Sequence, residues 1–84
     1  MTESSSALPR IAILGGTGRE GSGLALRWAH AGYAVTLGSR SADKALTGAT
    51  ELNQLLGREA ISGTDNMSAA AGADIVVLTL PYSA

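Results

Sequence analysis

The chain has 84 residues, 45% of them hydrophobic, which is enough for one globular domain with a thin core. Its six basic and seven acidic residues are scattered and give a net charge of −1, so there is no basic stripe for nucleic acid. The absence of cysteine excludes disulfides, thiolate metal sites and a cysteine nucleophile, and the single histidine cannot form a metal site by itself.

The longest apolar run, residues 75–80 with one threonine, is far shorter than the ~20 residues that a membrane span needs. The first residues also lack the basic segment of a secretory signal. We therefore expect a soluble, cytoplasmic protein that binds neither nucleic acid nor membrane. Residues 1–9 are polar, rich in serine and end in proline, so we expect them to form a disordered leader.

From residue 10 onward, short apolar runs alternate with segments of helical periodicity. Residues 10–14 predict a buried parallel strand, because they form a short, mostly apolar run with two β-branched isoleucines. Two glycines end this run. Apolar residues then recur at helical spacing, among them Trp28, which we assign to the core, and Gly32 would end this helix. Residues 34–37 predict a second strand.

A second helix is expected to begin at the cap residue Ser41 and to end at Gly57. We assign Leu52, Leu55 and Leu56 on its apolar face to the core. The other members of that face are Ala42, Ala45, Leu46 and Ala49.

The rest of the chain predicts two more strands. Residues 59–62 are a weak third strand, Asn66 would cap a short helix through residue 71, and residues 74–80 form a continuous apolar fourth strand. Right-handed crossovers in this β-α-β-α-β-α-β order give a parallel sheet with the spatial order 3-2-1-4. The predicted fold class is therefore α/β, a Rossmann-type parallel sheet with flanking helices that forms the first half of a doubly wound fold.

A glycine-rich loop follows the first strand and opens a helix: Gly16-Thr17-Gly18-Arg19-Glu20-Gly21. It matches the dinucleotide-binding pattern G-x-G-x-x-G in the structural context that the pattern requires. Gly16 would permit the tight turn, Gly18 would let a pyrophosphate approach the backbone, and Gly21 would let the helix pack against the strand. Arg19 either contacts a phosphate or is solvated, and Glu20 would stabilise the positive helix end. The alternative is a glycine-rich turn without a ligand.

The end of the second strand indicates which dinucleotide binds. NAD-binding domains place a carboxylate there, about 20 residues after the loop, to bind the ribose hydroxyls. This sequence has Ser39 and Arg40 instead, with Lys44 one helical turn further on. A planar guanidinium and an ammonium suit a 2′-phosphate, so the pattern favours NADP(H) over NAD(H). The alternative is a solvated surface arginine beside a helix start.

Taken together, residues 11–18, 23–29, 38–40 with Lys44, and 74–81 resemble the NADPH-dependent reductases of the deazaflavin coenzyme F420. The resemblance implies that residues 10–84 form an NADP(H)-binding Rossmann domain and that hydride passes between NADP(H) and coenzyme F420. It assigns the phosphate loop to Thr17, Gly18, Arg19 and Glu20, the 2′-phosphate to Ser39, Arg40 and Lys44, and the wall of the cofactor cleft to Pro81 and Tyr82. No catalytic side chain is assigned, because hydride transfer depends on proximity and orientation.

The chains of that family are longer, so we expect this one to be truncated after the fourth strand and to lack the deazaflavin-binding part. Residues 74–80 are apolar on both faces and would need cover on each side. We therefore expect the isolated chain to be marginally stable, inactive towards deazaflavin and prone to form a homo-oligomer. The alternatives that stay open are an atypical short-chain dehydrogenase or another NADP-dependent oxidoreductase, and an NADP(H)-sensing domain without catalysis.

Overall fold

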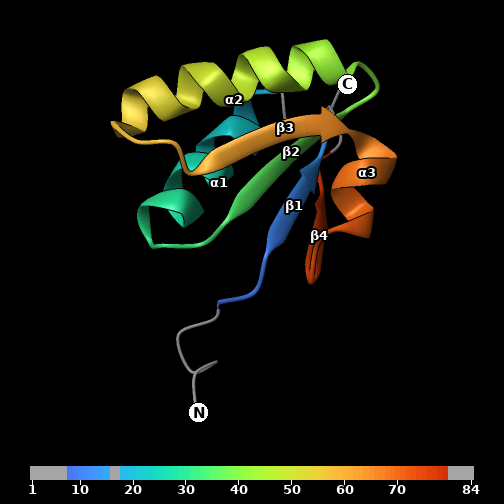
Figure 1. Ribbon diagram of the computed structural model, residues 1–84, viewed down its shortest axis with the longest axis horizontal. Coiled ribbons are helices and arrows are strands. Elements are labelled where there is room, and N and C mark those ends of the chain that lie inside the picture. Colours follow the sequence, from blue (N-terminus) through green and yellow to red (C-terminus); the bar gives the residue numbers. More distant parts are fainter. Residues whose placement is uncertain (1–7, 16–17, 80–84) are drawn as a thin grey trace.

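A four-stranded parallel sheet organises the computed structural model, which describes residues 8–15 and 18–79 (Figure 1). The strands are β1 (Ile11–Leu14), β2 (Val35–Ser39), β3 (Ile61–Asp65) and β4 (Ile75–Leu78), and the helices are α1 (Arg19–His30), α2 (Ala42–Leu56) and α3 (Asn66–Ala71). The observed order β3-β2-β1-β4 confirms the predicted α/β fold and its strand order. Residues 1–7 of the expected leader lie outside the described part of the chain.

The main core lies between the sheet and the pair of helices α1 and α2. Ile11 pairs with both Val35 and Ile75, so side chains of matching register share one face of the sheet. On that face, large strand residues meet four helix alanines, which lets the helices approach closely, and one helix leucine. The strand residues are Ile11, Ile13, Val35, Leu37 and Ile61, and the helix residues are Ala25, Ala29, Ala45, Ala49 and Leu52. Trp28 and Leu56 are partly buried against this core, which confirms their assignment.

Leu55 was assigned to the core wrongly, because 75% of it is exposed. The buried stripe of α2 follows Ala45, Ala49 and Leu52. At 100° per residue, Leu55 lies roughly 80° around the helix from Ala45, at the margin of the face that meets the sheet. Leu46 lies at the opposite margin and is 57% exposed.

The opposite face of the sheet carries α3. Gly38 of β2 lies under this helix, because a Cβ atom there would come within 2.8 Å of Asn66 Oδ1 and 3.1 Å of Ala69 Cβ. Further along the same face, the hydroxyl groups of Thr36 and Ser62 form a hydrogen bond of 2.9 Å between β2 and β3. This face is thus covered by one short helix at the carboxyl ends of the strands.

Two helix ends follow the sequence prediction. The Ser41 hydroxyl caps α2 by accepting a hydrogen bond from the backbone N–H of Lys44 at 3.3 Å. Gly57 ends α2 in the left-handed conformation, with a φ of +87°, and its N–H donates to the carbonyl of Asn53 at 2.8 Å.

The predicted cap of α3 is wrong by one residue. Asp65 occupies the cap position, and its carboxylate accepts a hydrogen bond from the backbone N–H of Ser68 at 3.1 Å. Hydrogen bonds from the Ser68 side chain and backbone lower the pKa of Asp65. The side chain of Asn66, already inside the helix, instead turns toward Gly15.

Strands β2 and β3 extend beyond their predicted ends, because the prediction ended each strand before a glycine that lies inside it. Gly38 pairs with Leu14 and with Thr64, so β2 continues to Ser39 rather than stopping at residue 37. In β3, a Cβ atom on Gly63 would collide with the backbone carbonyl of Ala45 in α2. Glycine therefore serves close packing at both positions, whereas the sequence pattern indicated a strand end.

Strand β4 is held at its start by Asp74, whose carboxylate accepts a hydrogen bond from the backbone N–H of Arg10 at 2.9 Å. This bond and the nearby guanidinium of Arg10 lower the pKa of Asp74. The strand is shorter than the predicted 74–80, and its side chains are poorly covered: Ile75, Val76 and Leu78 are 44%, 47% and 63% exposed. No helix in the described ranges has both the length and the apolar character needed to cross a membrane.

Candidate cofactor-binding site

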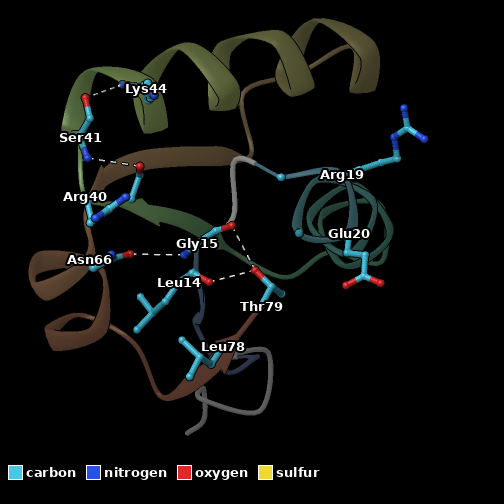
Figure 2. A pocket seen from close by; sticks show the side chains of 13 residues that line it. Leu14, Gly15, Arg19, Glu20, Arg40, Ser41, Lys44, Asn66, Leu78 and Thr79 are labelled. Carbon is cyan, nitrogen blue, oxygen red and sulfur yellow. Dashed lines mark hydrogen bonds between the residues drawn. The ribbon is translucent and has the colours of Figure 1, made fainter. Parts of the chain in front are cut away.

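A cleft of about 900 Å³ opens at the carboxyl ends of the strands (Figure 2). Parallel α/β sheets bind their ligands at this edge, near the point where the strand order reverses. The cleft is lined by Leu14, Gly15, Gly18, Arg19, Glu20, Gly21, Ser39, Arg40, Ser41, Lys44, Asn66, Leu78 and Thr79. Every predicted site residue in the described part of the chain is among them. Gly16, Thr17, Pro81 and Tyr82 lie outside the described residues.

The N-terminal end of α1 forms one wall of the cleft. Gly18 is the cap residue and is extended, with φ −79° and ψ 174°, and having no side chain it offers no cap of its own. A Cβ atom at this position would meet a single group within 4 Å, the Gly15 carbonyl at 3.9 Å, among the described atoms. The backbone is thus open to a ligand, and the N–H groups of the first helical turn favour an anion there.

The ends of β2 and α2 form the opposite wall. Ser39 is 8% exposed, and its hydroxyl accepts a hydrogen bond from the backbone N–H of Ser41 at 3.3 Å, which shapes the turn into α2. Arg40 is exposed at the tip of this turn, and Lys44 follows in the first turn of α2 (Figure 2). The structure therefore brings Ser39, Arg40 and Lys44 to one side of the cleft, as predicted.

The charges of this wall have no internal counter-ion in the described ranges. The ion pair observed among the described residues joins Arg10 to Asp74 at 3.5 Å. It lies at the opposite end of the sheet, where β1 and β4 begin. Neither Arg40 nor Lys44 pairs with a carboxylate of the described residues. Two exposed cations on one wall favour a ligand with a concentrated negative charge.

Arg19 and Glu20 lie on α1, at the rim of the cleft. In Figure 2 the Arg19 side chain extends away from Arg40 and Lys44, and the Glu20 carboxylate also points away from them. This arrangement favours the solvated role for Arg19. Among the described cleft residues, no carboxylate faces the wall formed by Arg40 and Lys44. Glu20 lies in the first turn of α1, where a carboxylate is favoured by the helix dipole.

The sequence interpretation did not assign Gly15, Asn66 and Thr79 to the site. The single proton of the Thr79 hydroxyl is shared between the backbone carbonyl oxygens of Leu14, at 2.9 Å, and Gly15, at 3.1 Å. From the other side, Asn66 Oδ1 accepts a hydrogen bond from the Gly15 N–H at 3.4 Å. Asn66 and Thr79 directly follow the observed strands β3 and β4, but the predicted strands 59–62 and 74–80 ended elsewhere, so the sequence pattern did not mark these two positions as part of the site.

Comparison with known proteins relates the sequence to one family. The sequence model of a family described as "NADP oxidoreductase coenzyme F420-dependent" matches residues 10–84. The chain is 52% identical over 77 residues to the F420-dependent NADP reductase of Methanothermobacter thermautotrophicus, covering 89% of this chain and 33% of the relative. The enzymes of the same name from Methanothermobacter marburgensis and Methanocaldococcus jannaschii are 44% and 43% identical, over 89% and 87% of this chain and 34% of each relative. The chain thus spans about a third of the length of the curated relatives it matches.

Proposed function

Because the chain belongs to the family of coenzyme F420-dependent NADP oxidoreductases, we propose that it is the NADP(H)-binding part of an enzyme that transfers hydride between NADP(H) and coenzyme F420. The observation that carries the proposal is the position of two exposed cations: Arg40 follows β2, where NAD-binding domains place a carboxylate, and Lys44 lies in the first turn of α2. The match of residues 10–84 supports this enzyme over a short-chain dehydrogenase and over a sensor without catalysis.

The residues of the cleft fit the charged parts of NADP(H). The open backbone at Gly18 and the first turn of α1, through Arg19, Glu20 and Gly21, would bind the pyrophosphate by their N–H groups. When bound, NADP(H) supplies the hydride or accepts it at its nicotinamide ring. The protein's contribution would be to bind and orient the cofactor, because hydride transfer depends on proximity and orientation.

At the other wall, Arg40 would form charge-assisted hydrogen bonds to the 2′-phosphate, and Lys44 would add a second positive charge. Ser39 would orient this turn through its bond to the Ser41 N–H. Gly16 and Thr17 in the loop, and Pro81 and Tyr82 beyond β4, complete the proposed site as predictions from the sequence. A cytoplasmic location and a homo-oligomeric assembly also belong to the proposal, the latter supported by the exposed apolar side chains of β4.

The test is the substitution Arg40→Ala, with NADPH and NADH titrated separately by isothermal calorimetry. Loss of charge-assisted bonds, each with a net value of ~1.5–3 kcal/mol, should weaken NADPH binding about tenfold or more. NADH lacks the 2′-phosphate and should bind with nearly unchanged affinity. Arg27→Ala is the matched control, because Arg27 is exposed on α1 outside the cleft and should affect neither cofactor. Equal losses of NADPH and NADH affinity in Arg40→Ala would refute the assignment.

A further inference from the structure

Gly15 lies directly before the phosphate loop, and it is held by three separate segments of the chain. Its N–H donates to the Gly38 carbonyl of β2 at 2.8 Å and to Asn66 Oδ1 of α3 at 3.4 Å. Its carbonyl oxygen accepts a hydrogen bond from the hydroxyl of Thr79, directly after β4, at 3.1 Å. Figure 2 shows Asn66 and Thr79 approaching Gly15 from opposite sides.

The backbone of Gly15 is in the left-handed region, with a φ of +74°, which glycine adopts without strain. A side chain is also excluded there, since a Cβ atom would come within 2.6 Å of the Thr79 carbonyl oxygen. A glycine in such a turn has many alternative conformations in the absence of contacts. Whatever fixes its carbonyl therefore fixes the direction in which the chain enters the loop.

The bonds of Thr79 divide into two kinds. Its backbone N–H donates to the Leu14 carbonyl at 3.1 Å, which continues the pairing of β4 with β1. Its hydroxyl reaches both Leu14, at 2.9 Å, and Gly15, at 3.1 Å. Removing the hydroxyl thus leaves the Leu14 carbonyl with its backbone donor at 3.1 Å. The Gly15 carbonyl keeps only the longer bond of 3.5 Å from the Gly18 N–H among the described residues.

We propose that Thr79 is a positioning residue: its hydroxyl holds the Gly15 carbonyl and thereby orients the phosphate loop to receive the pyrophosphate. This inference rests on the proposed NADP(H) site. It couples the end of β4 to the loop after β1, which are 64 residues apart in the sequence. Thr79 acts on the cofactor through Gly15 and is not itself assigned a contact with it.

The test compares two ligands in Thr79→Val and Thr79→Ser. NADP⁺ needs both the phosphate loop and the 2′-phosphate wall, whereas adenosine 2′-monophosphate carries the 2′-phosphate without a pyrophosphate. Valine is close to threonine in shape and lacks the hydroxyl. Because it removes one hydrogen bond that orients the loop, we expect Thr79→Val to weaken NADP⁺ by about threefold to tenfold. Adenosine 2′-monophosphate should bind as it does to the parent chain, and Thr79→Ser should restore NADP⁺ binding.

Each outcome decides one question. If Thr79→Val binds NADP⁺ as well as the parent chain does, or if Thr79→Ser is as weak as Thr79→Val, the positioning role is wrong. If Thr79→Val loses both ligands equally, Thr79 supports the whole fold rather than the loop, and the inference also fails. If the parent chain itself does not bind NADP⁺, the proposed function fails, and the inference that rests on it fails for that separate reason.

Discussion

A valine at position 18 tests the phosphate loop most directly, because the structure separates its effect on the fold from its effect on the ligand. Gly18 has an extended backbone, with φ −79° and ψ 174°, which valine adopts readily. Its Cβ would meet a single described group, the Gly15 carbonyl at 3.9 Å. Valine is a poorer helix cap than glycine, so Gly18→Val should lower the free energy of unfolding by about 1 kcal/mol or less.

The same side chain would occupy the space through which a pyrophosphate reaches the backbone. Phosphate oxygens bind backbone N–H groups at about 2.7–2.9 Å, and a branched side chain beside them prevents this approach. Losing two such charge-assisted bonds, each with a net value of ~1.5–3 kcal/mol, weakens binding by about a hundredfold or more. NADPH and NADH share the pyrophosphate, so Gly18→Val should lose both, in contrast to Arg40→Ala.

The assay is calorimetric titration of NADPH and NADH, together with urea unfolding followed by circular dichroism. Gly23→Ala is the control: Gly23 lies in α1 with no described atom within 4 Å of a Cβ placed on it. Alanine there should stabilise the helix by up to ~1 kcal/mol and leave binding unchanged. NADPH affinity that survives Gly18→Val within about threefold would place the pyrophosphate elsewhere. A chain that unfolds would show that the space at position 18 is not open.

Two further predictions concern the sheet. Gly63→Ala should lower the free energy of unfolding by about 3 kcal/mol, because its methyl group collides with the α2 backbone at Ala45. The control Gly72→Ala should cost little, since a Cβ there lies at an ordinary 3.8 Å from the Ser68 carbonyl. Equal urea midpoints for the two variants would contradict the packing argument. The isolated 84-residue chain should sediment as an oligomer, because apolar side chains of β4 are exposed beside an edge that no described strand covers, and Val76→Lys should reduce the association. A monomer over the whole concentration range, with or without NADPH, would refute this prediction.

The sequence predicted the strand order and the two walls of the cleft because both depend on short-range patterns. A β-branched run followed by glycines identifies β1, and the cap residues Ser41 and Gly57 bound α2 through bonds within one turn. The cleft follows from these elements, since the carboxyl ends of parallel strands meet at one edge. Knowing where β1 and β2 end was therefore enough to bring Arg40 and the loop at Gly18 to the same cleft.

The errors arose where two local choices are chemically equivalent and a distant contact decides between them. Asp65 and Asn66 are both good helix caps, and nothing nearby in the sequence distinguishes them. Asp65 caps α3 while the Asn66 amide meets Gly15, which lies 51 residues earlier in the chain. Leu55 likewise fits the apolar pattern of α2, but it lies at the margin of the helix face that meets the sheet, and 75% of it is exposed.

The glycines that the sequence pattern treats as strand ends share one structural role. At Gly15, Gly38 and Gly63, a Cβ atom would overlap a group from another element: the carbonyl after β4, the Asn66 side chain of α3 and the backbone of α2. Two of the three, Gly15 and Gly38, are joined by a hydrogen bond of 2.8 Å next to the cleft. The absence of side chains there is what allows Asn66 and Thr79 to reach the backbone of the loop. The glycines that would let NADP(H) approach the protein thus lie near glycines that let other elements support the loop. A larger residue in the first set should weaken binding by blocking the cofactor, and one in the second set should weaken it by displacing the loop.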